Sequence, residues 1–288
     1  MSLRHQVRAM DGIQVKEDQI REYRENGVAI IPRAVSPEWV AFMRQALDEL
    51  MDKPTEMGLE YAYHEDSTRF FGDQYMWLTR PKFRKIAFES GIAEIAGALM
   101  GSNKVNLFFD QVLVKEPGAV EPTPWHHDLP YWMVDGEQIC TIWIALDPVS
   151  VENGGMRYVK GSHLSGELYS PTFFGNSAKD DTFDQTRYKP MPDVESTYGD
   201  DEFLSYDLEP GDAAVHHART IHGAPGNASS GTRRRGYMLR VFGDNVGYAP
   251  EPGQAKVAVR PDLPPGAPMG GEYFPEIWRR AGASQAAE

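Results

Sequence analysis

The chain has 288 residues, 41% of them hydrophobic and 11% aromatic, which is enough apolar material for a sizeable buried core. Its formal net charge of -13 argues against nucleic acids and anionic membranes as partners, because both are bound mainly through lysine and arginine. The single cysteine, Cys140, cannot form an internal disulfide, and there is no signal pattern or long apolar run. We therefore expect a globular cytoplasmic protein whose partners are neither nucleic acids nor membranes.

The first hundred residues are mainly helical in pattern. Residues 16–26 predict a short polar helix, and residues 28–31 a short apolar strand. A longer helix is expected to begin at Pro37, capped by the hydroxyl of Ser36. Residues 81–100 predict a third helical stretch that is broken near its middle. Because the apolar residues of these helices form stripes, we expect them to buttress another layer.

Between the helices, residues 52–80 are rich in glycine and aromatic residues and show no repeat. A connection of this length is unusual in a compact domain unless it has a function. Its aromatic side chains would suit the wall of an apolar substrate pocket, but they would equally suit packing over one end of the core. The sequence leaves both interpretations open.

A long apolar strand is predicted over residues 105–115, with Asp110, Gln111 and Lys115 as polar interruptions. Polar groups in such a strand must be hydrogen-bonded or lie at an edge. Gln111 and Lys115 are four residues apart and so share one face of the strand. We therefore take both as candidates for a pocket.

A cluster of potential metal ligands follows in Trp125-His126-His127-Asp128. In an extended segment His126 and Asp128 project from the same face, while His127 points away. One imidazole and one carboxylate, completed by a second imidazole from elsewhere, form the facial triad that holds non-haem Fe(II) and leaves positions open. The His-x-Asp pattern alone is common by chance, so its context decides.

The second imidazole is expected near the end of the short apolar strand at residues 213–215, where His216, His217 and His222 follow. Strand geometry alone does not choose among the three. The spacing from His222 to Arg233, eleven residues, favours His222, because an arginine that binds a co-substrate must lie on the adjoining strand close to the metal.

Arg233 opens a run of three arginines before the strand-like residues 237–242. The planar guanidinium of an arginine can hold a carboxylate through two parallel hydrogen bonds. We expect Arg233 to do so. Arg235 shares its face, and Arg234 takes the role if the strand register is shifted by one residue.

The order His126-x-Asp128, His222 and Arg233, with Glu152-Asn153-Gly154-Gly155 and Lys160-Gly161-Ser162-His163 between them, resembles the phytanoyl-CoA dioxygenase family over about residues 15–245. The resemblance implies a mainly β fold, a double-stranded β-helix (a cupin-like jelly roll) with flanking helices. It also implies Fe(II), 2-oxoglutarate as co-substrate, and O2. In that case the metal ligands and catalytic residues are His126, Asp128 and His222, and the residues near 2-oxoglutarate are Arg233, Trp143, Lys115 and Gln111.

Two positions depart from the family pattern. His127 stands where glutamine is common, and Ala224 stands where serine is frequent. Neither is a ligand position. Asp128 also separates the chain from the related halogenases, in which chloride takes the place of the carboxylate.

We expect one dioxygenase domain over residues 1–288. It would comprise a helical buttress with loops (1–103), a β core (104–246) with a lid insertion (165–203), and a tail rich in proline and glycine (247–288).

The expected reaction is hydroxylation of an unactivated C–H bond in a largely apolar small molecule, a secondary metabolite or an acyl derivative, with release of succinate and CO2. Desaturation, cyclisation and epimerisation stay open. Two alternatives are a cupin-like metal dioxygenase that needs no 2-oxoglutarate, and a non-catalytic jelly-roll binding module. The first gives no reason for Arg233, and the second none for three ligands in this order.

Overall fold

Two antiparallel sheets face each other in the computed structural model, which describes residues 13–171, 187–250 and 261–283. The main sheet has the order β1-β10-β7-β12-β4-β3-β2, with β14 also paired to β4, and the smaller sheet has the order β5-β11-β8-β9. Most strands that are adjacent in the sheets are distant in the sequence, as expected for the jelly roll. The main-sheet strands are β1 (Val28–Ile31), β10 (Ala213–His217), β7 (Ile139–Ala145), β12 (Arg234–Phe242), β4 (Lys104–Lys115), β3 (Phe70–Gln74), β2 (Leu59–Glu60) and β14 (Glu276–Arg279). The other strands are β5 (Thr123–His126), β11 (His222–Ala224), β8 (Arg157–Val159), β9 (Phe203–Ser205), and the separate pair β6 (Val134–Gly136) and β13 (Val246–Tyr248).

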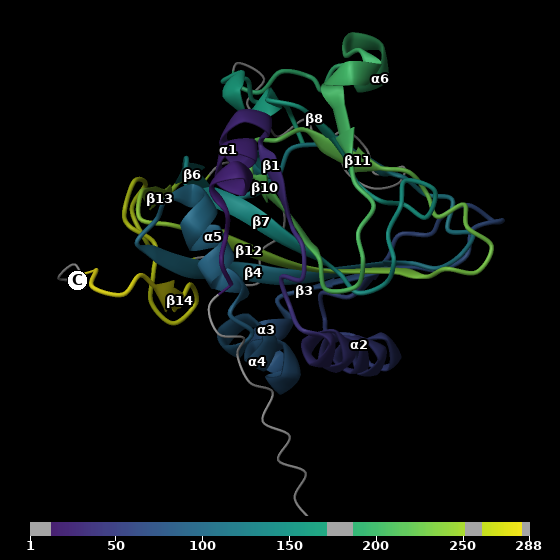
Figure 1. Cartoon of the computed structure of the whole chain (residues 1–288), viewed down its shortest axis with the longest axis horizontal. Coiled ribbons are helices and arrows are strands. Elements are labelled where there is room, and N and C mark those ends of the chain that lie inside the picture. The colour runs from purple at the N-terminus through teal and green to yellow at the C-terminus, as the bar shows by residue number, and fades with distance from the viewer. Residues whose placement is uncertain (1–12, 172–186, 251–260, 284–288) are drawn as a thin grey trace, which may run out of the picture.

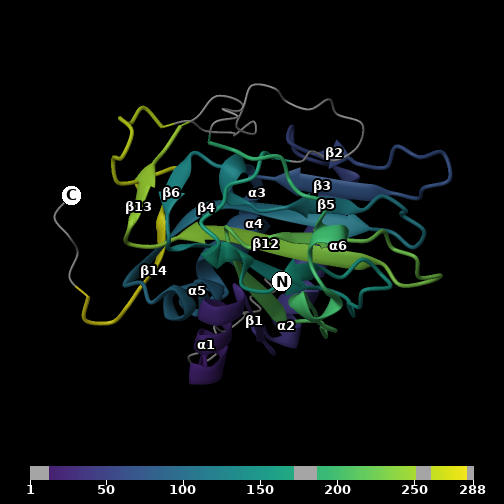
Figure 2. The same cartoon turned by 90° about the horizontal axis from the view of Figure 1, so that it is seen from above.

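Helices cover the main sheet on the side away from the smaller sheet. Figure 1 shows α2, α3 and α4 below the main sheet, with β8 and β11 above it. From above, β3, β4 and β12 run side by side (Figure 2). The α-helices are α1 (Glu17–Asn26), α2 (Pro37–Asp52), α3 (Met76–Thr79), α4 (Pro81–Glu89), α5 (Ile92–Met100) and α6 (Val194–Thr197). The predicted start of α2 is confirmed, because the Ser36 hydroxyl accepts a hydrogen bond from the Trp39 amide at 3.3 Å.

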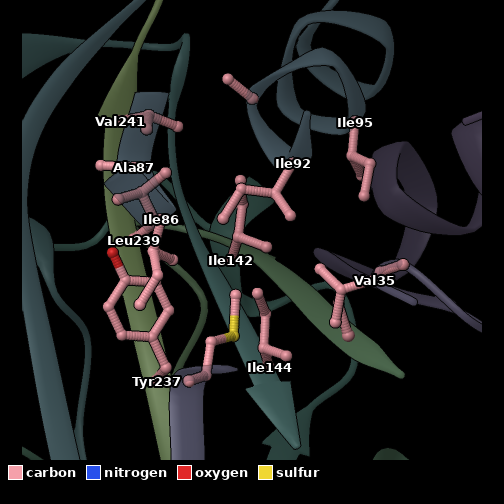
Figure 3. Close-up of a cluster of buried hydrophobic side chains, with 14 of the residues drawn as sticks. Val35, Ile86, Ala87, Ile92, Ile95, Ile142, Ile144, Tyr237, Leu239 and Val241 are labelled. Atoms are coloured by element: carbon pink, nitrogen blue, oxygen red, sulfur yellow. The ribbon is translucent and has the colours of Figure 1, made fainter. Parts of the chain in front are cut away.

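The central strands divide their side chains between two environments. On β7, Ile142 and Ile144 pack against the helices, and on β12 Leu239 and Val241 do the same (Figure 3). Each fully buried aliphatic side chain of this kind contributes about 1.5–3 kcal/mol through removal of apolar surface from water. This layer attaches the helices to the sheet.

The alternate residues of the same strands face the smaller sheet. They include Thr141 and Trp143 on β7, and Met238 and Arg240 on β12, all of which line one cavity. The register between β12 and β4 shifts between Arg240 and Val241, so that β4 carries one extra residue there. A bulge of this kind re-aims neighbouring side chains, and the cavity is built on this face.

Two regions are more ordered than the sequence indicated. Residues 52–80, expected to be a loop, contain β2, β3 and α3, and β3 pairs with β4 in the main sheet. The expected C-terminal tail contains β14, which pairs with the other end of β4. Trp278 of β14 packs against Gly97 of α5. A Cβ atom at Gly97 would come within 2.3 Å of the Trp278 ring, so the contact requires glycine. Such long-range pairing is not visible in local composition.

The segment expected to form a lid, 165–203, includes residues 172–186, which lie outside the described residues. The closure of this segment therefore stays a prediction. Among the described residues, no helix is long and apolar enough to cross a membrane.

We expect Asp110→Asn to stabilise the protein increasingly between pH 4 and pH 7. Asp110 lies on the helix side of β4, where its carboxylate accepts a hydrogen bond from the Trp77 amide at 3.2 Å. Burial raises the pKa of Asp110 from its usual 3.8 to about 7. As pH rises, the Asp110 carboxyl group ionises in the unfolded chain before it ionises in the folded protein. It therefore lowers the free energy of unfolding as pH rises, by up to about 4 kcal/mol at pH 8. Asparagine does not ionise.

The measurement is urea unfolding of the wild type and of Asp110→Asn at pH 4.5 and pH 8. The difference between their free energies of unfolding should grow with pH. Asp201→Asn makes the same chemical change at an exposed position and is the control. A difference that is equal at both pH values would contradict the assignment.

Candidate active site

A cavity of about 430 Å³ lies between the two sheets, and the three candidate metal ligands are in its wall. His126 ends β5, and His222 begins β11 directly opposite it in the strand pairing. Asp128 follows two residues after β5, so its carboxylate reaches the same space. One ligand atom from each of the three residues lies within 4.8 Å of the others. The structure thus brings together the three residues that sequence spacing selected.

Hydrogen bonds fix which nitrogen of each histidine is free. The Nδ1 atom of His126 lies 2.8 Å from the Pro124 carbonyl, and Nδ1 of His222 lies 2.9 Å from the Thr220 carbonyl. A carbonyl can only accept, so each Nδ1 donates a proton and each Nε2 keeps its lone pair. This arrangement is typical of metal-binding histidines, whose other nitrogen is hydrogen-bonded. Burial, reinforced by the nearby His126 and His216, also lowers the pKa of His222 well below its usual value.

The carboxylate of Asp128 is held by a row of side chains on the main sheet. His216, Thr141 and Arg240 are paired across β10, β7 and β12. The Thr141 hydroxyl donates to Oδ2 of Asp128 at 2.7 Å, His216 Nε2 donates to the same oxygen at 3.3 Å, and Arg240 Nη2 lies 4.0 Å from Oδ1.

Burial acts to raise the pKa of the Asp128 carboxyl group, but Arg240 and the histidine hydrogen bonds outweigh it. The result is a pKa well below the usual value. Asp128 is therefore an anion and can serve as a metal ligand.

The histidines that sequence reasoning left undecided have other roles. His216 uses Nε2 to donate to Asp128, so it supports the carboxylate. His217 points away, and its Nε2 donates to the Glu137 carbonyl at 2.9 Å. His127 also points away, as alternation predicted, and accepts a hydrogen bond from the Tyr169 amide at 2.9 Å. Burial lowers the pKa of His127 to about 4, which keeps it neutral as that acceptor.

Of the three consecutive arginines at 233–235, Arg234 is the one that lines the cavity. Its side chain is only 1% exposed, and Nε and Nη2 donate to the Gly154 carbonyl at 3.0 and 2.6 Å. Gly154 has φ of 92°, in the left-handed region that favours glycine, and belongs to the Glu152–Gly155 motif. The guanidinium lies 5.5 Å from the Trp143 ring centroid, while Nη1 is buried without a hydrogen-bond partner among the described residues.

Arg233 differs from its expected position. Its side chain, 39% exposed, lies outside the cavity and forms a two-bond ion pair with Glu116, through Nε at 2.9 Å and Nη2 at 2.6 Å. The physical reason is strand register. Arg234 pairs with Lys115 and lies on the same face as Met238 and Arg240, whereas its neighbours must face elsewhere. The arginine named as the fallback is thus the one in the cavity.

The other three residues expected near 2-oxoglutarate differ in position. Trp143 and Gln111 line the cavity. Lys115 does not line it. This lysine pairs with Arg234 across the strands and is fully buried; its Nζ donates to the Pro225 carbonyl at 2.6 Å and lies over the Phe70 ring. Burial, and then the charge of Arg234, lower the pKa of Lys115 well below its usual value.

The sequence did not identify Arg240 as a cavity residue. It also left open whether the aromatic residues of the segment 52–80 line a pocket or pack in the core. Tyr61 and Tyr75, from the region left open between wall and core, line the cavity, while Trp77 packs in the core. Arg240 carried a signal, since it alternates with Leu239 and Val241 inside an apolar strand. A charged residue at such a position must face a partner or a pocket.

These residues fit iron and 2-oxoglutarate. Two free imidazole nitrogens and one carboxylate are the donor set of the facial triad, which leaves further positions open. Arg234 lines the same cavity, and its buried Nη1 has no hydrogen-bond partner among the described residues. A buried charged donor is costly to leave unpaired, so it suits an anionic acceptor such as a carboxylate of 2-oxoglutarate.

Comparison with known proteins assigns the family. The phytanoyl-CoA dioxygenase model matches residues 23–236. The chain belongs to the phytanoyl-CoA dioxygenase family. The multifunctional dioxygenase prhA of Penicillium brasilianum is 28% identical over 233 residues, which cover 76% of this chain and 70% of that protein.

Solved structures agree with this family. The alpha-ketoglutarate-dependent carbocyclase SnoK from nogalamycin biosynthesis aligns with a TM-score of 0.70 at 27% identity, covering 92% of this chain and 97% of that one. The epimerase SnoN, solved with Fe3+, alpha-ketoglutarate and nogalamycin RO, aligns with a TM-score of 0.68 at 26% identity, covering 91% and 98%. This member of the family is a non-haem iron and 2-oxoglutarate-dependent dioxygenase. The jelly-roll fold and the three cofactors expected from the sequence are confirmed, and the two alternative classes are wrong.

We expect Thr141→Val to weaken Fe(II) binding by about 10- to 100-fold, the usual effect of removing a hydrogen bond to a ligand. Valine has the same shape but cannot donate to Asp128. The measurement is anaerobic calorimetric titration with Fe(II). Thr123→Val is the matched control, since Thr123 lines the same cavity and its hydroxyl has no partner among the described residues. An unchanged affinity in Thr141→Val would show that this bond does not support the metal.

Proposed function

We propose that the protein hydroxylates a C–H bond of a largely apolar small molecule, with iron held by His126, Asp128 and His222 and with 2-oxoglutarate bound through Arg234. The observation that carries this proposal is the single cavity that contains both the triad and a buried arginine with one free donor. Arg234 replaces Arg233 in the role first expected from the sequence.

Arg234 is held ready for a carboxylate. Two of its nitrogens are anchored on the Gly154 carbonyl, which leaves Nη1 directed elsewhere. Burial lowers the pKa of Arg234 to about 10, so it still carries its charge at neutral pH. The Trp143 ring lies over Gly236, where a Cβ atom would come within 2.4 Å of it. The glycine thus makes room for an aromatic wall beside the arginine.

When bound, iron and 2-oxoglutarate supply the oxidising chemistry, in which O2 is consumed and 2-oxoglutarate becomes succinate and CO2. The chain's own contribution is positioning. Thr141 and His216 hold one oxygen of Asp128, and the backbone carbonyls behind His126 and His222 orient both rings. A cavity wall with much aromatic and aliphatic surface limits water around the reacting carbon.

The wall of the cavity supports an apolar substrate. Its aromatic and aliphatic members include Tyr75, Phe109, Tyr131, Trp132 and Met238. Two similar proteins with solved structures are a carbocyclase and an epimerase of nogalamycin biosynthesis, which supports a secondary metabolite as substrate class. Ring closure and epimerisation begin, like hydroxylation, with removal of a hydrogen atom from a substrate carbon. We choose hydroxylation because it needs neither a second reacting group in the substrate, as ring closure does, nor a hydrogen donor on the opposite face, as epimerisation does.

We expect Arg234→Gln to raise the dissociation constant of 2-oxoglutarate by about 100-fold, because a buried charge-assisted bond is lost. Arg233→Gln, the adjacent surface variant, should leave it within about twofold, as exposed ion pairs contribute little. The measurement is anaerobic titration of the Fe(II)-loaded protein with 2-oxoglutarate, followed through the weak visible band of the chelate.

The same titration tests the proposed ligands. A wild-type protein that binds Fe(II) but forms no band would remove 2-oxoglutarate from this cavity. If Arg233→Gln weakened the band and Arg234→Gln did not, the register argument would be wrong. Failure to bind Fe(II) would reject the triad itself.

A further inference from the structure

A second buried arginine, Arg240, lies in the same cavity as the triad. It is only 9% exposed, yet its Nε and Nη1 atoms have no hydrogen-bond partner among the described residues. Within the same residues, the one carboxylate oxygen that comes within 4.0 Å is Oδ1 of Asp128, at that distance from Nη2. This separation is too long for a hydrogen bond. Most of this guanidinium therefore remains available to a ligand.

Arg240 is surrounded by aromatic walls. Its Cζ atom lies 4.9 Å from the centre of the Phe109 ring and 5.6 Å from that of Trp132. Tyr75 stacks on Phe109 at 4.8 Å between ring centres, with 18° between the planes. Ring faces attract the cation, but they offer no strong hydrogen-bond acceptor. A ligand here would meet one positive group inside an otherwise largely apolar wall.

The charges of the loaded site leave Arg240 unbalanced. Fe(II), Arg234 and Arg240 would together bring four positive charges, whereas Asp128 and the two carboxylates of 2-oxoglutarate bring three negative charges. Asp110, the other buried acid nearby, points to the helix side of the sheet and bonds to the Trp77 amide. Glu56 lines the cavity but is exposed. One positive charge of the loaded site thus remains without a matching buried anion, and Arg240 has the donors free to bind one.

We propose that Arg240 binds an anionic oxygen group of the substrate, a carboxylate or an ionised phenol or enol, attached to an apolar ring-bearing body that packs on Phe109 and Trp132. This inference rests on the proposed function and names the substrate class for that site. Arg240 and Arg234 are six residues apart on β12, about 20 Å along the strand, so the two arginines serve different anions.

The position of Arg240 also selects the carbon that reacts. Its Nη2 lies beside Asp128, a proposed metal ligand, so an anion held here lies next to the metal position. The oxidised carbon is therefore close to the anionic group of the substrate and not at the far end of its apolar body.

The test uses a matched pair of probes, 2-naphthoate and 2-naphthamide, which share one ring system and differ in charge. Each is titrated anaerobically into the full chain loaded with Fe(II) and 2-oxoglutarate, and binding is followed through the visible band of the chelate. The wild type should bind the carboxylate more tightly than the amide by about tenfold or more, as expected for a charge-assisted bond in a buried site.

Two variants isolate the charge. Arg240→Gln and Arg240→Met should both bind the two probes equally while keeping the chelate band. Arg240→Met is included because its apolar side chain suits the surrounding wall and keeps the test valid if Arg240→Gln does not fold. Arg240→Lys should keep part of the preference, because the charge remains but the planar donor group is lost. Arg233→Gln, directly before the same strand and outside the cavity, should behave as the wild type does.

Three outcomes would overturn the assignment. The first is equal binding of both probes by the wild type. The second is loss of the band in both neutral variants, which would make Arg240 a positioning residue for Asp128. The third is a band that collapses as naphthoate is added, because the probe would then be displacing 2-oxoglutarate. A wild type that never forms the band is a separate result, which overturns the proposed function and this inference with it.

Discussion

The pairing of β5 with β11 is the constraint on which the rest of the site depends. It places His222 opposite His126, although the two residues are almost a hundred positions apart in the sequence. The chain then turns after β5, so that Asp128 reaches the same point from one side. Because each imidazole donates its Nδ1 proton to a nearby carbonyl, both Nε2 atoms remain free where the strands meet. The positions of the three metal ligands are therefore set mainly by backbone pairing and not by the choice of side-chain conformation.

The main sheet supplies the opposite wall and decides what each position on it can do. Side chains on alternate positions of β7 and β12 either join the helix-facing core or face the cavity. A substitution at a core-facing position should therefore leave the cavity-facing side chains largely unchanged, and the reverse holds as well. The polar members of the cavity set are concentrated around Asp128, where Thr141, His216 and Arg240 lie on adjacent strands. A buried carboxylate needs such support to stay charged.

Charge is distributed along β12 in a way that suits two different anions. Arg234 has two nitrogens bound to a backbone carbonyl and one free, whereas Arg240 has aromatic rings around it and no close acceptor. A rigid, partly satisfied arginine suits a small co-substrate that is the same in every turnover. An arginine among ring faces suits the charged end of a larger apolar molecule. The two interactions together would orient both reactants relative to the triad.

The sequence by itself determined the three candidate ligands, the family, and the helices near residues 16–26, from Pro37 and over residues 81–100, because these depend on local spacing, capping and short motifs. It also determined that Thr141 and Trp143 share a face, since alternation within a strand is a local property. Only the tertiary structure decided between Arg233 and Arg234. In β12 both alternate sets contain large apolar residues, such as Leu239 in one and Met238 in the other, so the pattern could not say which face was inside. Pairing with β4 and β7 settled the question. The same reason explains why β3 and β14 emerged only from the fold: their partners are distant in the sequence, and contacts of that range leave no local pattern.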